Sequence, residues 1–170
     1  MANPSNEEAR RFTRDCIYKS MYLLLETTPY DQITLRALAQ KAGVSRNAIY
    51  RNFKSKDDIL KTYVREFAAS VSRVLEQAGD CSDETYITIL FQQLCAFHKQ
   101  AKILTDLGMY ALLLETFMSI RGRFSDSEVH RDYFENYRIG AIFFVYLTWL
   151  KNDCRETPEQ LCAIVRSIEQ

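Results

Sequence analysis

The sequence predicts an all-α protein, on the strength of three observations. Only five of its 170 residues are glycine and three are proline, so few backbone breakers interrupt the chain. Apolar residues recur at a spacing of three to four positions, the period of an amphipathic helix. Breaks in this pattern coincide with helix-capping residues. We expect about nine helices, with a three-helix domain over residues 1–54, a helical domain over 55–170, and a helix over 55–78 that links them.

The first three predicted helices are clearly bounded. Apolar spacing predicts a helix over residues 7–27, which the Thr-Pro-Tyr-Asp sequence at 28–31 ends. Thr34 suits the N-cap of a second helix that ends before Gly43. Ser45 then suits the N-cap of a very short third helix.

The later helices are longer and less sharply separated. Ser55 begins the linking helix, and a Thr157-Pro158 pair with Gln160 begins the last one, which we expect to run to the C-terminus. Between them the apolar spacing predicts three helical segments, over residues 83–99, 103–124 and 127–151. The middle segment contains Gly108 and forms either one helix or two.

Residues 34–50 have the order helix, glycine turn, helix, which is the pattern of a DNA-binding helix-turn-helix. Ala39 is small where two helices cross, and Gly43 permits a left-handed backbone in the turn. Val44 and Ile49 provide apolar contacts that hold the second helix. Its outer positions are then free to reach DNA, and they include Arg and Asn, the residue types that read guanine and adenine edges.

The distribution of charge supports this interpretation, although the chain as a whole has 22 basic and 22 acidic residues. Residues 1–67 hold 12 basic and 8 acidic side chains, net +4, whereas residues 68–170 hold 10 and 14, net −4. Residues 32–56 contain six basic side chains and no acid. A local basic surface of this kind is what binding to the phosphate backbone requires.

A specific motif makes residues 13–67 resemble the DNA-binding domain of the TetR/AcrR family of bacterial transcriptional regulators. Its residues are Ile33-Thr34, Leu38-Ala39, Ala42-Gly43-Val44-Ser45, Ile49-Tyr50, Phe53, Ser55-Lys56 and Leu60. The tail from Tyr133 to Val165 resembles the family's last two helices less specifically. Two departures are Asn52, where the family more often has His or Tyr, and Pro29-Tyr30, where it has Gly and an aromatic residue.

The resemblance implies a homodimer that binds a palindromic operator on double-stranded DNA and responds to a small-molecule effector in the C-terminal domain. The base-contacting candidates are Arg36, Arg46, Asn47 and Tyr50. The phosphate-contacting candidates are Thr34, Ser45, Arg51, Asn52, Lys54 and Lys56. Tyr50 and Lys56 match the motif itself, and Ser45 also fits a purely structural role as a cap.

The C-terminal region is rich in aromatic residues, which at helical spacing either fill a core or line an apolar ligand pocket. The candidates for a pocket are Phe91, Cys95, Tyr110, Leu113, Phe117, Tyr137 and Phe144. Glu115 and Arg138 lie in apolar helical stretches, where each either orients a polar ligand or forms a surface ion pair. These candidates favour a mid-sized, largely apolar effector.

Residues 139–150 are apolar on nearly every face of their predicted helix. A helix in a small domain buries one face in its own core, so the other face needs cover from a second subunit. We therefore expect a homodimer through the helices near 127–151 and 158–168.

Other function classes have little support in the sequence. We identify no catalytic residues, because no nucleophile–base pair or phosphate loop is present. Cys95 and His98 share a helical face, but no further ligands at metal spacing accompany them, so we expect no metal and no cofactor. The polar N-terminus and the twelve-residue apolar run predict a cytoplasmic protein without a membrane segment. The main alternative keeps the fold but makes the C-terminal domain a docking site for a protein partner, with no small-molecule effector.

Overall fold

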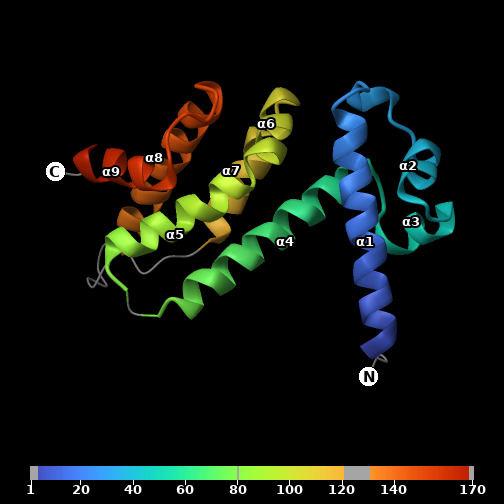
Figure 1. The fold of residues 1–170 in the computed structure, drawn as a ribbon, viewed down its shortest axis with the longest axis horizontal. Coiled ribbons are helices and arrows are strands. Elements are labelled where there is room, and N and C mark those ends of the chain that lie inside the picture. Colours follow the sequence, from blue (N-terminus) through green and yellow to red (C-terminus); the bar gives the residue numbers. More distant parts are fainter. Residues whose placement is uncertain (1–3, 80, 121–130, 169–170) are drawn as a thin grey trace. The chain divides into compact units, whose positions relative to one another are not determined.

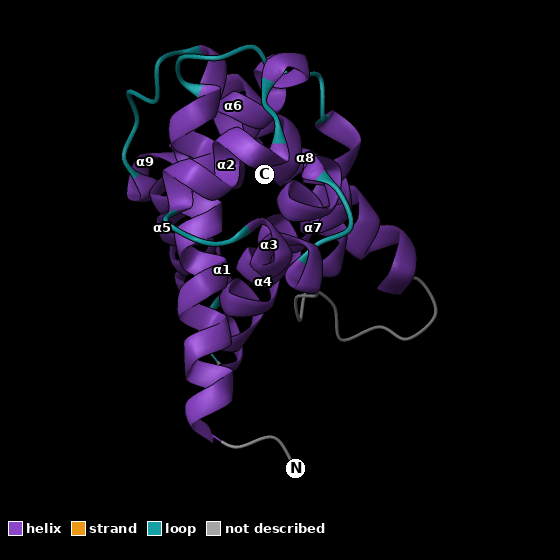
Figure 2. Cartoon of the chain, turned by 90° about the vertical axis from the view of Figure 1, so that its right-hand side faces the viewer, coloured by secondary structure: helices purple, strands orange, loops and turns teal. Residues whose placement is uncertain are grey.

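The computed structural model describes residues 4–79, 81–120 and 131–168. These residues form nine α-helices and one short 3₁₀ helix, with no strand among them (Figures 1 and 2). The elements are α1 (Pro4–Leu25), η1 (Tyr30–Gln32), α2 (Leu35–Ala42), α3 (Arg46–Asn52), α4 (Lys56–Gln77), α5 (Asp83–Ala96), α6 (His98–Asp106), α7 (Tyr110–Ser119), α8 (Arg131–Lys151) and α9 (Pro158–Ile168). The protein is therefore all-α.

The chain divides into two compact units, an N-terminal unit of residues 1–63 and a C-terminal unit of residues 64–170. The division falls inside α4, which is continuous through it. The boundary expected from the sequence, after residue 54, lies just before the first residue of α4.

Local capping chemistry sets the ends of α2 and α3. The Thr34 hydroxyl accepts a hydrogen bond from the Ala37 N–H at 3.1 Å, and the Ser45 hydroxyl accepts one from the Ala48 N–H at 3.1 Å. Each satisfies a backbone donor that the first helical turn leaves unpaired. Gly43 ends α2 with φ +66°, a left-handed conformation that side chains with a Cβ rarely adopt. The caps and the turn are those that the sequence predicts.

The core of the N-terminal unit holds α2 and α3 against α1. Ile17 of α1, Leu38 of α2 and Ile49 of α3 are each fully buried. Phe53, which follows α3, is also buried and packs its ring 5.5 Å from that of Tyr18. Because α3 is only seven residues long, its position depends on this packing rather than on its own helical stability.

In the C-terminal unit, α5 packs along α9, and α8 contacts α6, α7 and α9. Two buried aromatic residues of α8 use their polar atoms on backbone carbonyls. The Tyr146 hydroxyl donates to the Leu94 carbonyl at 2.8 Å, and the Trp149 indole N–H donates to the Glu156 carbonyl at 3.0 Å. Such bonds satisfy the polar ends of side chains that are otherwise core.

The last helix begins with the capping box that its sequence predicts. The Gln160 N–H donates to the Thr157 hydroxyl at 3.3 Å, and the Thr157 N–H donates to the Gln160 side-chain oxygen at 2.8 Å. Pro158 is the first residue of α9, where its missing N–H costs no helical hydrogen bond.

The expected single helix over residues 83–99 is wrong, because α5 ends at Ala96 and α6 begins at His98. The residue between them, Phe97, is buried and stacks on Phe67 of α4 with ring centroids 4.0 Å apart. The His98 ring nitrogen Nδ1 hydrogen-bonds the Cys95 carbonyl at 2.7 Å. Tertiary packing of Phe97 therefore accompanies a break that no glycine or proline marks.

The remaining boundaries also differ in detail. The predicted segment 103–124 is the end of α6 followed by α7, and the two are separated at Gly108, whose φ is +72°. The helix expected over 127–151 is described from Arg131, since residues 121–130 lie outside the described part of the chain. The helix expected to reach the C-terminus is described to Ile168.

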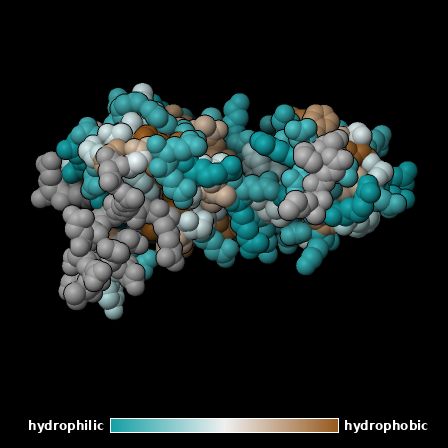
Figure 3. All heavy atoms as spheres, turned by 90° about the horizontal axis from the view of Figure 1, so that it is seen from below, coloured by the Kyte–Doolittle hydropathy of each residue, from teal (hydrophilic) through white to brown (hydrophobic). Residues whose placement is uncertain are grey.

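Among the coloured residues of Figure 3, hydrophilic ones are spread over the face and hydrophobic ones form separate patches. None of the described helices is both long enough and apolar enough to span a bilayer.

Candidate nucleic-acid interface

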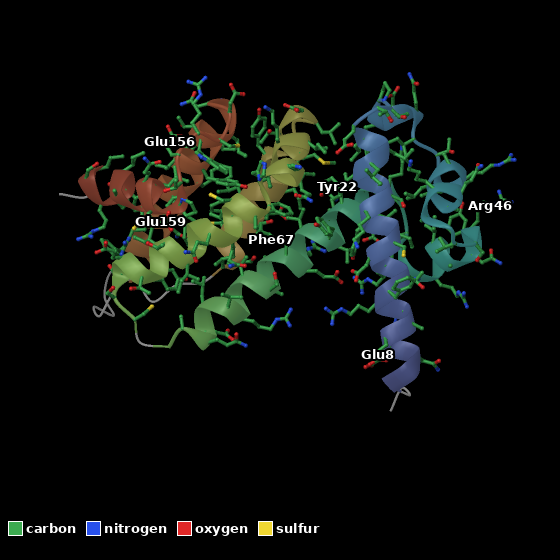
Figure 4. All side chains as sticks on the ribbon, in the orientation of Figure 1. Glu8, Tyr22, Arg46, Phe67, Glu156 and Glu159 are labelled. Carbon is green, nitrogen blue, oxygen red and sulfur yellow. The ribbon has the colours of Figure 1, made fainter. Side chains whose placement is uncertain are left out.

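Helix α3 presents predicted DNA-contacting side chains on one exposed face. Arg46, Asn47, Tyr50 and Arg51 are exposed, and Tyr50 keeps 60 % of its surface accessible. Ile49 points the other way and is fully buried. Figure 4 shows Arg46 extending from α3 on the side away from α1. The buried residue thus fixes the helix from behind while the polar side chains point to solvent.

A shallow depression of about 500 Å³ lies on this face, lined by Ser45, Asn47, Tyr50 and Arg51. The Ser45 hydroxyl accepts its bond from α3, as the Thr34 hydroxyl does from α2. Each hydroxyl keeps its own proton for another acceptor, such as a phosphate oxygen. Capping and phosphate contact are therefore compatible roles for both residues.

Two other predicted contacts, Arg36 and Lys54, are also exposed. Arg36 lies in the first turn of α2, and Lys54 lies between α3 and α4. The Lys54 backbone N–H donates to the Asp58 carboxylate at 2.8 Å, which fixes this connection while its side chain remains exposed.

Asn52, by contrast, uses its side chain within the protein. Its amide NH₂ donates to the Ala48 carbonyl at 2.7 Å, and its amide oxygen accepts from the Arg10 Nε–H at 3.2 Å. Asn52 is half-buried, so it connects the end of α3 to α1 instead of standing free on the surface.

Lys56 is also engaged with the chain. Its ammonium donates to the Tyr30 carbonyl at 2.6 Å and lies 4.6 Å from the centroid of the Tyr30 ring. The Tyr30 hydroxyl hydrogen-bonds the Asp57 carboxylate. Burial, followed by this bond to Asp57, raises the pKa of the Tyr30 hydroxyl. Lys56 and Asp57 together tether η1 to the first turn of α4.

The structure adds α1 residues that sequence reasoning missed. A groove of about 520 Å³ lies between α1 and α3, and it is lined by Asn6, Ala9, Arg10, Thr13, Ala48, Arg51 and Asn52. The four α1 residues follow one another at helical spacing, so they share one face. The spacing of these α1 residues can be seen in the sequence, but no local feature of the sequence indicates that α3 packs beside this face of α1.

The structure distributes the seven pocket candidates of the C-terminal unit over different environments. Phe91, Leu113 and Phe117 are buried, and Cys95 is half-buried. Tyr110, Tyr137 and Phe144 are exposed in the single chain. The seven therefore do not enclose one site.

Phe117 alone of these residues lines a small cavity of about 10 Å³, together with Leu90, Ile120, Ile139 and Ile142. This volume is about that of one water-sized probe. It is too small for a drug-sized molecule, which needs hundreds of cubic ångströms.

Arg138 is buried, with 3 % of its surface accessible, and its guanidinium donates to the Asp83 carboxylate at 2.8 Å. The pair joins α8 to the first turn of α5, and Arg138 also lies over the Phe134 ring at 5.8 Å. Of the two roles that the sequence left open for Arg138, the ion pair is the one observed, but Arg138 is buried and not on the surface. Glu115 is exposed on α7.

The cysteines of the chain are all free thiols. Burial, followed by the proximity of Cys154 and Glu159, raises the pKa of Cys95 to about 11. Its thiolate, the reactive form, is thereby disfavoured at neutral pH. Within the described ranges no three His, Cys, Asp or Glu side chains gather as they would around a metal ion.

Residues 23–63 match the sequence model of a family described as bacterial regulatory proteins, tetR family. This match covers the C-terminal end of α1, all of α2 and α3, and the start of α4, and the geometry of α2 and α3 is that of a helix-turn-helix. Residues 23–63 thus carry the DNA-binding helix-turn-helix of the tetR family.

One curated relative of this chain is the HTH-type transcriptional regulator AlkX of Mycobacterium tuberculosis (strain ATCC 25618 / H37Rv). The two are 35 % identical over 65 residues, which is 38 % of this chain. The match spans 31 % of the length of AlkX.

Two solved structures share the fold over nearly the whole chain. The dihydroxyacetone kinase operon activator DhaS superposes with a TM-score of 0.67 at 16 % identity, covering 92 % of this chain and 93 % of its own. The fatty acid degradation regulator FadR from Bacillus halodurans gives a TM-score of 0.64 at 23 % identity, covering 99 % and 95 %. At these identities the likeness describes the fold alone, over both units of the chain.

Proposed function

We propose that this tetR-family regulator is a cytoplasmic repressor that binds a palindromic operator as a homodimer. The observation that carries the proposal is the exposed polar face of α3, held from behind by the buried Ile49. Arg46, Asn47 and Tyr50 on α3, with Arg36 on α2, contact base edges in the major groove. The phosphate contacts come from exposed residues of the same unit: Thr34, Ser45, Arg51 and Lys54.

Two copies are needed because half-sites of a helix-turn-helix operator lie one helical turn apart, about 34 Å. The apolar surface of α8 supports a dimer. Tyr137 and Phe144 are 61 % and 67 % exposed in the single chain, and Ile164 and Ile168 of α9 are exposed too. We propose that α8 and α9 pack on the same helices of a second copy, which removes these side chains from water.

The effector is proposed to be a small, largely apolar molecule that enters the C-terminal unit. Its supporting observation is the apolar lining of the cavity beside Phe117, Ile139 and Ile142. Since that cavity measures about 10 Å³, binding would require α7 and α8 to separate. A binding-competent state of this kind is a minor conformation that a ligand makes dominant.

The same small cavity favours a second candidate function. A filled core with exposed apolar side chains on α7 and α8 fits a DNA-bound factor that docks a protein partner without any small molecule. Both candidates share the DNA-binding unit and differ only in what the C-terminal unit recognises.

Selection of duplexes from a random library by the full chain tests the DNA-binding proposal. We expect a palindromic sequence to emerge, and we expect R46A to weaken its binding by about 1–3 kcal/mol and to relax preference at one position per half-site. R73A, on the exposed surface of α4, is the matched control. A library in which no sequence is enriched, or equal effects of R46A and R73A on every operator variant, would contradict the proposal.

Sedimentation of the full chain tests the dimer. We expect a dimer at micromolar concentration, weakened in F144A by about 1 kcal/mol or more. Y110A removes an exposed aromatic side chain from α7 and should leave the dimer intact. A monomeric wild-type chain would overturn this part of the proposal.

Operator release distinguishes the two candidates for the C-terminal unit. Straight-chain fatty acids of increasing length are added to the protein–operator complex, with a short carboxylic acid as the polar control. Release that strengthens with chain length supports an apolar effector, because each buried CH₂ contributes about 0.8 kcal/mol. The absence of any release by apolar probes favours the protein-docking alternative.

A further inference from the structure

We infer that the groove between α1 and α3 binds a DNA phosphate, with Arg10 as the contact and Asn52 as the residue that positions it. This inference rests on the proposed function, since it extends the DNA-binding surface from α3 onto the N-terminal half of α1. Arg10 lies outside the helix-turn-helix of residues 34–52, and Asn52 is the last residue of its second helix.

The two depressions of the N-terminal unit meet at Arg51. This residue lines the depression on the exposed face of α3 and also the groove between α3 and α1. Polar surface is therefore continuous from Asn47 and Tyr50, through Arg51, to Arg10. A duplex seated on α3 would meet this groove at its edge.

The position of the groove explains which part of the DNA it would meet. The major groove is bordered on both sides by phosphate backbone, so elements that flank a recognition helix face phosphates, not bases. Helix α1 contacts α3, and its N-terminal turns project beyond α3 in both views (Figures 1 and 2). Arg10 and Thr13 lie on the face of α1 that lines the groove beside α3.

The chemistry of the lining suits a phosphodiester. The groove has two arginines and several neutral polar side chains, and none of its lining residues is acidic. Glu7 lies three positions before Arg10 on α1, at the spacing of helical neighbours, but neither Glu7 nor Glu8 lines the groove. An arginine presents paired N–H donors that match the oxygens of a phosphate.

Asn52 gives the arginine a defined orientation. Its amide is held by the Ala48 carbonyl on one side and accepts the Arg10 Nε–H on the other, across 42 positions of sequence. The hydrogen bond to Nε leaves the two terminal NH₂ groups of the exposed Arg10 directed to solvent. A side chain oriented in advance loses less conformational freedom on binding. The amide at position 52 is thus a positioning group for α1.

The test compares R10A and N52A with R11A, which removes the same charge from an exposed position outside the groove. Binding of the full chain is measured over a salt series, on the selected operator and on a random-sequence duplex. Each phosphate contact contributes about 0.9 to the slope of log K against log salt. We expect R10A to flatten the slope by about that amount per protein subunit on both duplexes, and R11A to leave it unchanged.

A double-mutant cycle separates positioning from direct contact. If Asn52 acts through Arg10, N52A weakens binding in the wild-type background and adds nothing to R10A. Ethylation interference should show the same phosphate losing its effect in both variants and keeping it in R11A. Thermal unfolding of each variant checks that the α1–α3 packing survives.

The outcomes separate this inference from the proposed function. If the chain selects an operator but R10A and R11A have equal salt slopes, or if the R10A and N52A effects add, the groove inference is overturned and the regulator proposal stands. If R10A flattens the slope on every duplex without any sequence being preferred, the groove inference stands and operator recognition fails. Absence of all DNA binding overturns both.

Discussion

The N-terminal and C-terminal units differ in how far apart in the sequence the residues lie that set their helix ends. In the N-terminal unit, the caps at Thr34 and Ser45 and the turn at Gly43 act within four residues, and the candidate functional side chains point outward from α3. In the C-terminal unit, the helix break at Phe97 accompanies a ring stack on Phe67, thirty positions away. The function of the first unit can therefore be located from local sequence, whereas that of the second cannot.

Aromatic residues make the same contrast. Phe91 is fully buried in α5, while Phe144 of α8 is 67 % exposed, although both lie in apolar helical stretches. Helical spacing alone does not say which face of a helix meets a neighbour when almost every face is apolar. In α3 only one residue is buried, so its two faces are distinct.

The largest effect expected concerns two adjacent leucines of α7. Leu113 is 1 % exposed and Leu114 is 39 % exposed. L113A should lower the free energy of unfolding by about 2–5 kcal/mol, because it leaves a cavity in the core, whereas L114A should change it by about 0.5 kcal/mol or less. Urea denaturation of both variants measures this. Similar losses would show that the packing of the C-terminal unit differs from the one described.

A second prediction tests whether the turn of the N-terminal unit is set by backbone conformation alone. A Cβ at Gly43 would meet no atom within 4 Å, but its φ is +66°. G43A should therefore cost about 1–2 kcal/mol through left-handed strain, and G43N should cost less, since Asn tolerates this conformation. Thermal unfolding compares the two variants. A neutral G43A would mean that the turn can relax.

Lys56 tests whether a motif residue acts on DNA or on the fold. The Lys56 ammonium donates to the Tyr30 carbonyl and lies over the Tyr30 ring. K56M should therefore lower the free energy of unfolding by about 1 kcal/mol. The salt slope of DNA binding should stay that of the wild type. K54M removes an exposed charge and is the control, with the opposite pattern expected. A slope flattened by about 0.9 in K56M, without loss of stability, would assign Lys56 to phosphate instead.

The smallest effect concerns pH and the C-terminal unit. Burial in the folded state raises the pKa of the Cys95 thiol from its ordinary value of 9.0 to about 11, so the folded state favours the protonated thiol. This contribution to stability is full below pH 9 and is lost as the pH rises through about 11. In C95A the free energy of unfolding should fall less as the pH rises, which urea denaturation between pH 8 and pH 10.5 measures. An identical decline in both proteins would contradict it.

Much of the fold follows from the sequence, as the capping box of Thr157 and Gln160 illustrates, since its two hydrogen bonds join residues three positions apart. The exposed face of α3 follows for the same reason, because one buried residue, Ile49, fixes the direction of its neighbours. The burial of the predicted pocket residues could not be predicted from the sequence, because it depends on how α5, α7 and α8 pack against one another.

The sequence by itself determined the helix boundaries that carry caps, the concentration of basic residues before position 57, and the recognition helix with its outward polar residues. Each depends on side chains within one or two helical turns, where spacing fixes geometry. Only the tertiary structure decided that Arg138 is buried against Asp83, that Lys56 tethers η1, and that Asn52 holds Arg10 beside α3. Those contacts join residues 26 to 55 positions apart, and the packing of whole helices brings them together.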